Sequence, residues 1–189
     1  MCEGTKTEPN YFDSIRKLLP PNIVSLQIEG IGANTLSLVE RARDLKDSRI
    51  ATDYPFDQVW VVFDHDSFPP DAFDNAITSA VAEGMQCAWS NEAFELWYVL
   101  HFEYRDTATS REDFGRILSR YLNEPYLKNS SEMYWKLSRL GNQQQAIARA
   151  RKLDEDFKIR QIPPSGANPC TTVYQLVEEL NRYLPLESE

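Results

Sequence analysis

The sequence has few cysteines and no long apolar run, and each shortage excludes a class of protein. Its three cysteines, Cys2, Cys87 and Cys170, are odd in number and widely spaced. This pattern argues against a disulfide framework or a zinc knuckle and favours a reducing compartment. No stretch approaches the roughly 20 apolar residues that span a bilayer, and no signal-peptide pattern opens the chain. We therefore expect a cytoplasmic protein with no membrane partner.

Positive charge is also scarce, which disfavours a non-specific nucleic-acid binder. The net charge is −9, with 20 Lys and Arg against 29 Asp and Glu. The distribution is uneven, because residues 1–103 carry 7 basic and 17 acidic side chains, whereas residues 104–160 carry 12 and 8. An acidic front half followed by a basic segment fits a metal-holding site beside a phosphate-holding surface. Ordinary variation of the surface charge is the alternative.

Strand and helix patterns alternate in the first half of the chain and give way to helices in the second. With 42% hydrophobic and 12% aromatic residues, the 189-residue chain has the composition of a folded protein with one good core. Strands are predicted over residues 22–29, 58–63 and 85–89, and helices follow each of them. Residues 46–56 are predicted as a polar loop, and Ser90 and Asn91 as the cap of the helix after the third strand. Later helices are predicted over residues 111–122, 133–140, 143–157 and 171–184. The fold class predicted is α/β: a mostly parallel sheet flanked by helices in a domain of residues 1–103, with a C-terminal helical extension, residues 104–189, packed on the same core.

Asp64 and Asp66 are the most informative residues of the sequence. They directly follow the β-branched and aromatic run of residues 58–63, and open α/β sheets bind ligands at the carboxyl ends of such strands. Two carboxylates so close together repel each other unless a proton or a cation lies between them. Their hard oxygens suit Mg²⁺, or Mn²⁺, better than zinc. The alternative is an acidic turn that only caps the helix after Pro69 and Pro70.

A second candidate segment, residues 3–8, precedes the first predicted helix. Gly4, Thr5 and Lys6 offer backbone N–H groups, a hydroxyl and a cation to a substrate phosphate. If a strand precedes Glu3, this carboxylate faces the acid pair across adjacent strand ends. Three alternatives stay open, because such a strand needs residues before Met1: the natural start lies upstream, the strand is absent, or the peptide is a frayed terminus.

The third candidate segment is the helix that follows the strand at residues 85–89. Ser90, Asn91 and Glu95 are expected at the cleft, Ser90 and Asn91 as phosphate contacts and Glu95 as a metal ligand or base; the alternative for Glu95 is a salt-bridged helix acid. His101 lies at the end of an aromatic stripe at helical spacing. It is either a proton donor near the metal or a hydrogen-bonded member of an aromatic core.

Four blocks of the sequence resemble the RloB family. They are residues 2–12 (CEGTKTEPNYF), 61–66 (VVFDHD), 90–103 (SNEAFELWYVLHFE) and 168–173 (NPCTTV). The resemblance implies a role in bacterial phage defence near restriction-modification loci. It also implies a Toprim-like domain. Toprim domains use a glutamate after their first strand and an Asp-x-Asp pair after their third strand. By this resemblance Glu3 matches the glutamate, and Asp64 and Asp66 match the pair. Such domains carry out Mg²⁺-dependent phosphoryl transfer or phosphodiester cleavage.

The function predicted is therefore a metal-dependent, nuclease-type phosphodiesterase of phage defence that stays inactive until a trigger appears. Glu3, Asp64 and Asp66 are the expected metal ligands, and Glu95 or His101 the expected proton carriers. Nucleic acid, DNA or RNA, is the expected partner, together with a protein from a defence locus. The alternative is a non-catalytic sensor module that binds a metal or nucleotide and acts through a protein partner.

Overall fold

The computed structural model describes residues 1–20, 27–30, 35–65 and 69–185. Within these ranges the helices are α1 (Thr7–Arg16), α2 (Thr35–Ala51), α3 (Pro70–Ala82), α4 (Glu95–Leu100), α5 (Arg111–Leu122), α6 (Met133–Leu140), α7 (Gln143–Ile159) and α8 (Val173–Asn181). The strands are β1 (Trp60–Asp64), β2 (Gln86–Asn91) and β3 (Cys170–Thr171), and a 3₁₀ turn, η1, covers Pro164–Gly166. No helix in the described part of the chain is both long enough and apolar enough to cross a membrane.

The sheet is small and mixed, so the prediction of a mostly parallel Toprim-like sheet is wrong. β1 and β2 pair in parallel from Trp60 opposite Gln86 to Asp64 opposite Ser90. β3 adds to the other edge of β2 in the antiparallel direction, and helices make up most of the described residues. Residues 27–29, which end the strand expected over 22–29, lie outside any strand, while residues 22–26 fall outside the described part of the chain.

Residues 1–3 are held against the sheet and do not fray. Cys2 forms parallel bridges with both Val62 and Gly30. The Glu3 N–H donates to the Val62 carbonyl at 2.8 Å, and the Val62 N–H donates to the Met1 carbonyl at 2.8 Å. This pairing extends the hydrogen-bonded layer beside β1 and brings Glu3 to the end of that strand.

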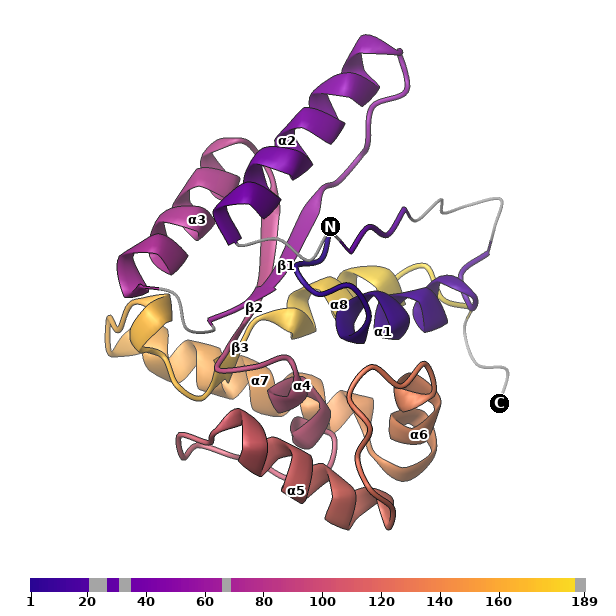
Figure 1. Cartoon of the computed structure of the whole chain (residues 1–189), viewed down its shortest axis with the longest axis vertical. Helices are drawn as coiled ribbons and strands as arrows, with labels where there is room; N and C mark the ends of the chain where they lie inside the picture. Colours follow the sequence, from indigo (N-terminus) through magenta and orange to yellow (C-terminus); the bar gives the residue numbers. More distant parts are fainter. Residues whose placement is uncertain (21–26, 31–34, 66–68, 186–189) are drawn as a thin grey trace.

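Helices cover both faces of the strands, which explains why β1 is apolar up to its last residue, Asp64. Phe63 and Trp89 point toward α3, where both rings contact Phe73 edge-on. Val62 points the other way and lies with Leu176 of α8 around an apolar cavity of 120 Å³. Figure 1 shows α2 and α3 side by side on one side of the strands and α1 and α8 on the other, with α4 to α7 beyond the lower strand ends.

Most helices follow their apolar periodicity, and two local predictions fail for physical reasons. Residues 46–51, expected as a polar loop, continue α2, a helix with only Leu38, Val39 and Ala42 buried in its first half. A mostly exposed helix has little periodicity to detect. Asn91, expected to cap the following helix, instead donates its amide to the carbonyls of Pro164 and Ser165, and α4 begins after Phe94 without a side-chain cap.

Candidate functional site at the carboxyl end of β1

Asp64 closes β1 at the point where the N-terminal segment also ends. Its backbone N–H donates to Oε2 of Glu3 at 3.1 Å, so the two carboxylate-bearing residues are adjacent, as the sequence predicted for neighbouring strand ends. The Oδ1 atom of Asp64 is buried and has no hydrogen-bond partner within the described residues. An unpaired buried carboxylate oxygen is costly, because folding removes its water without replacing it.

Glu8 brings a second buried carboxylate to this position from the first turn of α1. Its side chain is only 5% exposed. Gly4 makes this possible, because a Cβ at Gly4 would stand 2.2 Å from Oε2 of Glu8. The backbone N–H groups of Glu8 and Gly4 also bond the Glu8 carboxylate and stabilise its charged form. The absence of a side chain at Gly4 therefore leaves the space that the Glu8 carboxylate occupies.

Glu95 supplies a third buried carboxylate from the first residue of α4. It is 3% exposed and accepts a hydrogen bond from the Tyr126 hydroxyl at 3.0 Å. Tyr126 comes from the segment between α5 and α6, which is tied to α1 by two bonds that Asn129 accepts, one from Thr7 and one from Asn10. Glu8, Asp64 and Glu95 are referred to below as the acidic cluster.

Burial and neighbouring acids oppose the ionisation of Asp64 and of Glu8. Burial, followed by the charges of Glu8 and Glu95, raises the pKa of Asp64 well above its usual range. Burial is also the main cause that raises the pKa of Glu8, and the charge of Glu95 adds to it. A site that penalises several negative charges at once favours either a shared proton or a bound cation.

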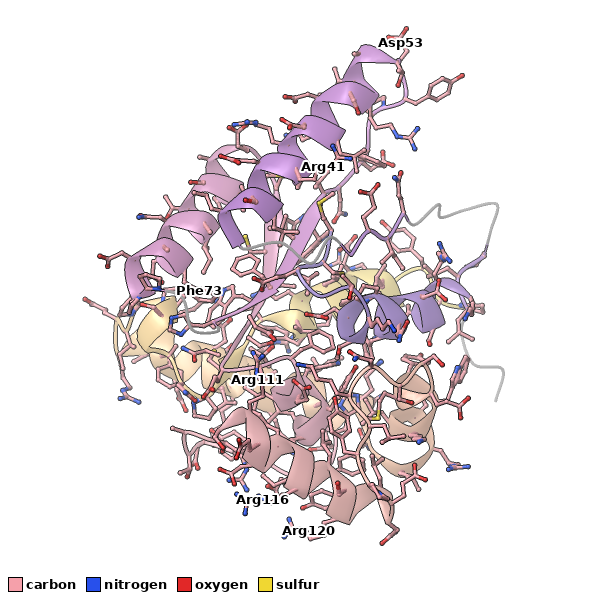
Figure 2. The ribbon with its side chains drawn as sticks, viewed as in Figure 1. Arg41, Asp53, Phe73, Arg111, Arg116 and Arg120 are labelled. Atoms are coloured by element: carbon pink, nitrogen blue, oxygen red, sulfur yellow. The ribbon has the colours of Figure 1, made fainter. Side chains whose placement is uncertain are left out.

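Two basic side chains border the acidic cluster. Arg111, the first residue of α5, places a guanidinium nitrogen 3.7 Å from Oδ2 of Asp64, and its charge lowers the pKa of that carboxyl against the larger effect of burial. Figure 2 shows Arg111 on the side of α5 that faces the strand ends. The charge of Lys128 likewise lowers the pKa of Glu8, against the larger effect of burial. The site thus combines carboxylates with cations that a phosphate group could bind.

The donor chemistry of the acidic cluster fits a hard divalent cation, but the described residues do not form a finished metal site. Carboxylate oxygens are the ligands of Mg²⁺ and Mn²⁺, and Oδ1 of Asp64 is free to bind one. In the part of the chain that the structure describes, no three His, Cys, Asp or Glu side chains are arranged to hold a metal. The predicted ligand Asp66 lies outside the described residues. A metal site here would need Asp66, or a small movement of Glu8 or Glu95.

The predicted phosphate contacts are found in different environments. Thr5 and Lys6 are exposed just before α1, and Gly4 lies against Glu8. Ser90 is buried, with its hydroxyl 3.0 Å from that of Thr171 in β3. Asn91 uses its amide to hold the segment around η1. Lys6 and Thr5 therefore remain accessible to a substrate, whereas Ser90 bonds to β3 and Asn91 to the segment around η1.

His101 lies in an aromatic core. Its Nδ1 is 2.9 Å from the Trp97 carbonyl, and its ring contacts the Trp97 ring edge-on. Burial lowers its pKa to about 4, with a smaller contribution from the nearby charge of Arg149. The imidazole is therefore neutral at pH 7 and poorly suited to donate a proton. Phe94, Trp97 and Tyr98 are buried as well, which matches the aromatic-core interpretation of this stripe.

Sequence reasoning missed four residues of the site, namely Glu8, Arg111, Tyr126 and Lys128. Glu8 belongs to a segment that the sequence did single out, and an acid in a first helical turn next to a glycine was a usable signal. Arg111, Tyr126 and Lys128 lie more than 45 positions from Asp64 in the sequence and reach the site only through the packing of α5 on α4. No local pattern marks them.

Comparison with known proteins gives a match to a family model. No curated protein and no solved structure matches the chain. The model described as RloB-like protein matches residues 1–180, from the N-terminal segment to the last turn of α8. The chain therefore belongs to the RloB-like protein family.

Proposed function

We propose that this chain is a metal-dependent phosphodiesterase of the nuclease type that acts in phage defence. The observation that carries the proposal is the acidic cluster, in which burial and the charges of Glu8 and Glu95 raise the pKa of Asp64, and its buried Oδ1 has no hydrogen-bond partner among the described residues. The carboxylates of the cluster repel one another when they are charged, and a bound cation relieves this repulsion. The basic residues beside the cluster, Arg111 at Asp64 and Lys128 near Glu8, support a substrate that carries phosphate.

The residues have distinct roles in this proposal. Asp64 and Asp66, with Glu3 or Glu8, would hold Mg²⁺ or Mn²⁺, which would supply charge stabilisation at the scissile phosphate and an activated water. Arg111 would leave Asp64 and bind a phosphate oxygen as the substrate arrives. Glu95, oriented by the Tyr126 hydroxyl, would take or return the proton. Lys6, exposed before α1, would bind a neighbouring phosphate.

The test is cleavage of labelled single- and double-stranded DNA and RNA with Mg²⁺ or Mn²⁺. The wild type is compared with Asp64→Asn, which removes the charge but keeps the shape, and with Asp44→Asn as a control at an exposed acid of α2. We expect Asp64→Asn to lose at least a hundredfold in rate and Asp44→Asn to keep full activity. Cleavage that is unchanged in Asp64→Asn would refute the assignment.

A non-catalytic sensor is the second candidate, and the Arg111–Asp64 ion pair is the observation that favours it. An arginine that already neutralises the central acid competes with a metal, and no three potential ligands among the described residues converge on one point. In this case Mg²⁺ or a nucleotide would raise the melting temperature of the wild type, but not of Asp64→Asn, without any cleavage. If the wild type shows neither cleavage nor a rise in melting temperature with Mg²⁺ or a nucleotide, both functions are rejected.

A further inference from the structure

A polar hollow lies on α5 and the segment before it, outside the acidic cluster. It has a volume of 320 Å³ and is lined by Arg105, Ala108, Thr109, Asp113, Arg116, Ile117 and Arg120. Figure 2 shows Arg116 and Arg120 extending from the side of α5 that faces away from the strands, whereas Arg111 lies on the other side. The hollow is therefore a separate site and not a continuation of the acidic cluster.

Three arginines around one hollow are unusual on a protein with a net charge of −9. Arg105, Arg116 and Arg120 face it, and Asp113 is the acidic residue among the lining side chains. Asp113 pairs with Arg116 from the same turn of the helix. Glu103 pairs with Arg105 and Arg120 from outside the lining, so the three arginines exceed the two acids that pair with them by one charge. An anion that enters the hollow therefore meets a net positive field.

Hydrogen bonds and ion pairs with neighbouring side chains also restrict the arginines of the hollow. Glu103 accepts a hydrogen bond from Nε of Arg105 at 3.0 Å, and its other oxygen is 3.4 Å from Arg120. The Tyr121 hydroxyl donates to that same oxygen of Glu103 at 2.6 Å, so the carboxylate is fixed in turn. Arg105 further reaches the Thr109 hydroxyl at 3.4 Å. Guanidinium groups held in this way lose less side-chain freedom when they bind a ligand.

We propose that this hollow binds a phosphate group of a nucleotide or of a nucleic-acid strand. Guanidinium groups match the geometry of phosphate oxygens with two parallel hydrogen bonds, which a halide or a single carboxylate uses less well. The volume is near the lower limit of small-ligand pockets and suits a sugar-phosphate unit. Arg116 and Arg120 are 79% and 67% exposed, so both can reach a ligand without rearrangement of the fold.

The experiment measures binding of inorganic phosphate, AMP and a single-stranded oligonucleotide in EDTA, so that it is independent of any metal-dependent cleavage. The test variant is Arg116→Ala/Arg120→Ala. The control is Arg41→Ala/Arg139→Ala, which removes the same charge from exposed positions of α2 and α6. We expect Kd of the probe that binds to rise about 10- to 100-fold in the test variant. The control should stay within about twofold.

The probes distinguish the two sources of the phosphate group. Binding of AMP identifies a nucleotide site, whereas binding of the oligonucleotide alone identifies a strand, and its salt slope should then fall by ~1.4 when two phosphate contacts are lost. Arg116→Lys/Arg120→Lys, which keeps the charge, should show an intermediate Kd and guards against a folding defect. The proposal is overturned if the wild type binds none of the three probes, or if the control variant loses as much affinity as the test variant.

Discussion

Individual side chains of this protein show how burial decides between a catalytic and a structural role. His101 and Asp64 were both candidates for chemistry from the sequence. His101 is buried with its ring edge-on to that of Trp97 and is a neutral core residue, whereas burial and the charges of Glu8 and Glu95 make the charge of Asp64 costly. The difference lies in the neighbours, which the sequence order does not reveal.

The buried histidine predicts a loss of stability in mild acid. The His101 pKa is about 4 in the folded protein against an ordinary value of 6.5, so below pH 6.5 the unfolded chain binds a proton that the folded chain does not. The contribution of His101 to stability is thus complete above pH 6.5 and is lost as the pH falls toward 4, by about 3 kcal/mol in total. Urea unfolding of the wild type and His101→Asn between pH 4 and 8 measures this directly. The variant should lack this part of the pH dependence, and equal slopes in the two proteins would contradict the prediction.

At the scale of elements, amphipathic helices were predictable and short pairings were not. α5 and α6 begin and end where the apolar spacing predicts, because each buries one regular face. β3 has only two residues, Cys170 and Thr171, and lies at the start of what the spacing predicted as one helix. Two residues carry no detectable alternation, so a strand of this length is defined only by its partner, β2.

The start of α5 is the element boundary with the clearest consequence for the site, because it positions Arg111 beside Asp64. The Ser110 hydroxyl accepts the Asp113 backbone N–H at 3.2 Å and donates to the Asp113 carboxylate at 2.7 Å. Ser110→Ala should lower the free energy of unfolding by about 1 kcal/mol, while Ser110→Thr should largely restore it. Ser79→Ala, at an exposed position within α3, is the control and should cause no loss. Denaturant titration of the four proteins checks this, and an Ala variant as stable as the wild type would contradict the cap.

At the scale of the whole molecule, two regions were predicted, residues 1–103 and 104–189, and whether they unfold together can be measured. The second region contributes β3 to the sheet of the first and sends Arg111 and Tyr126 to the acidic cluster. A functional site assembled from both regions needs them to fold together. The sequence revealed Asp64 and the helical second half, but the contacts that join the two regions, such as Glu95 with Tyr126 (31 positions apart) and Trp89 with Thr172 (83 positions apart), depend on the finished packing.

Thr172 provides the test of this dependence. Its hydroxyl accepts the Trp89 backbone N–H of β2 at 2.9 Å, and its own N–H donates to the Trp89 carbonyl at 2.8 Å. Thr172→Val would leave a buried N–H unpaired and should cost about 1–3 kcal/mol, whereas Thr172→Ser keeps the hydroxyl and should cost less. If both regions form one cooperative unit, the unfolding curves from circular dichroism and from tryptophan fluorescence coincide in all three proteins and shift together in the variants. Two separate transitions, with only one of them moved by Thr172→Val, would show instead that the second region unfolds on its own, and the acidic cluster would then lose Arg111 and Tyr126 before the sheet itself opens.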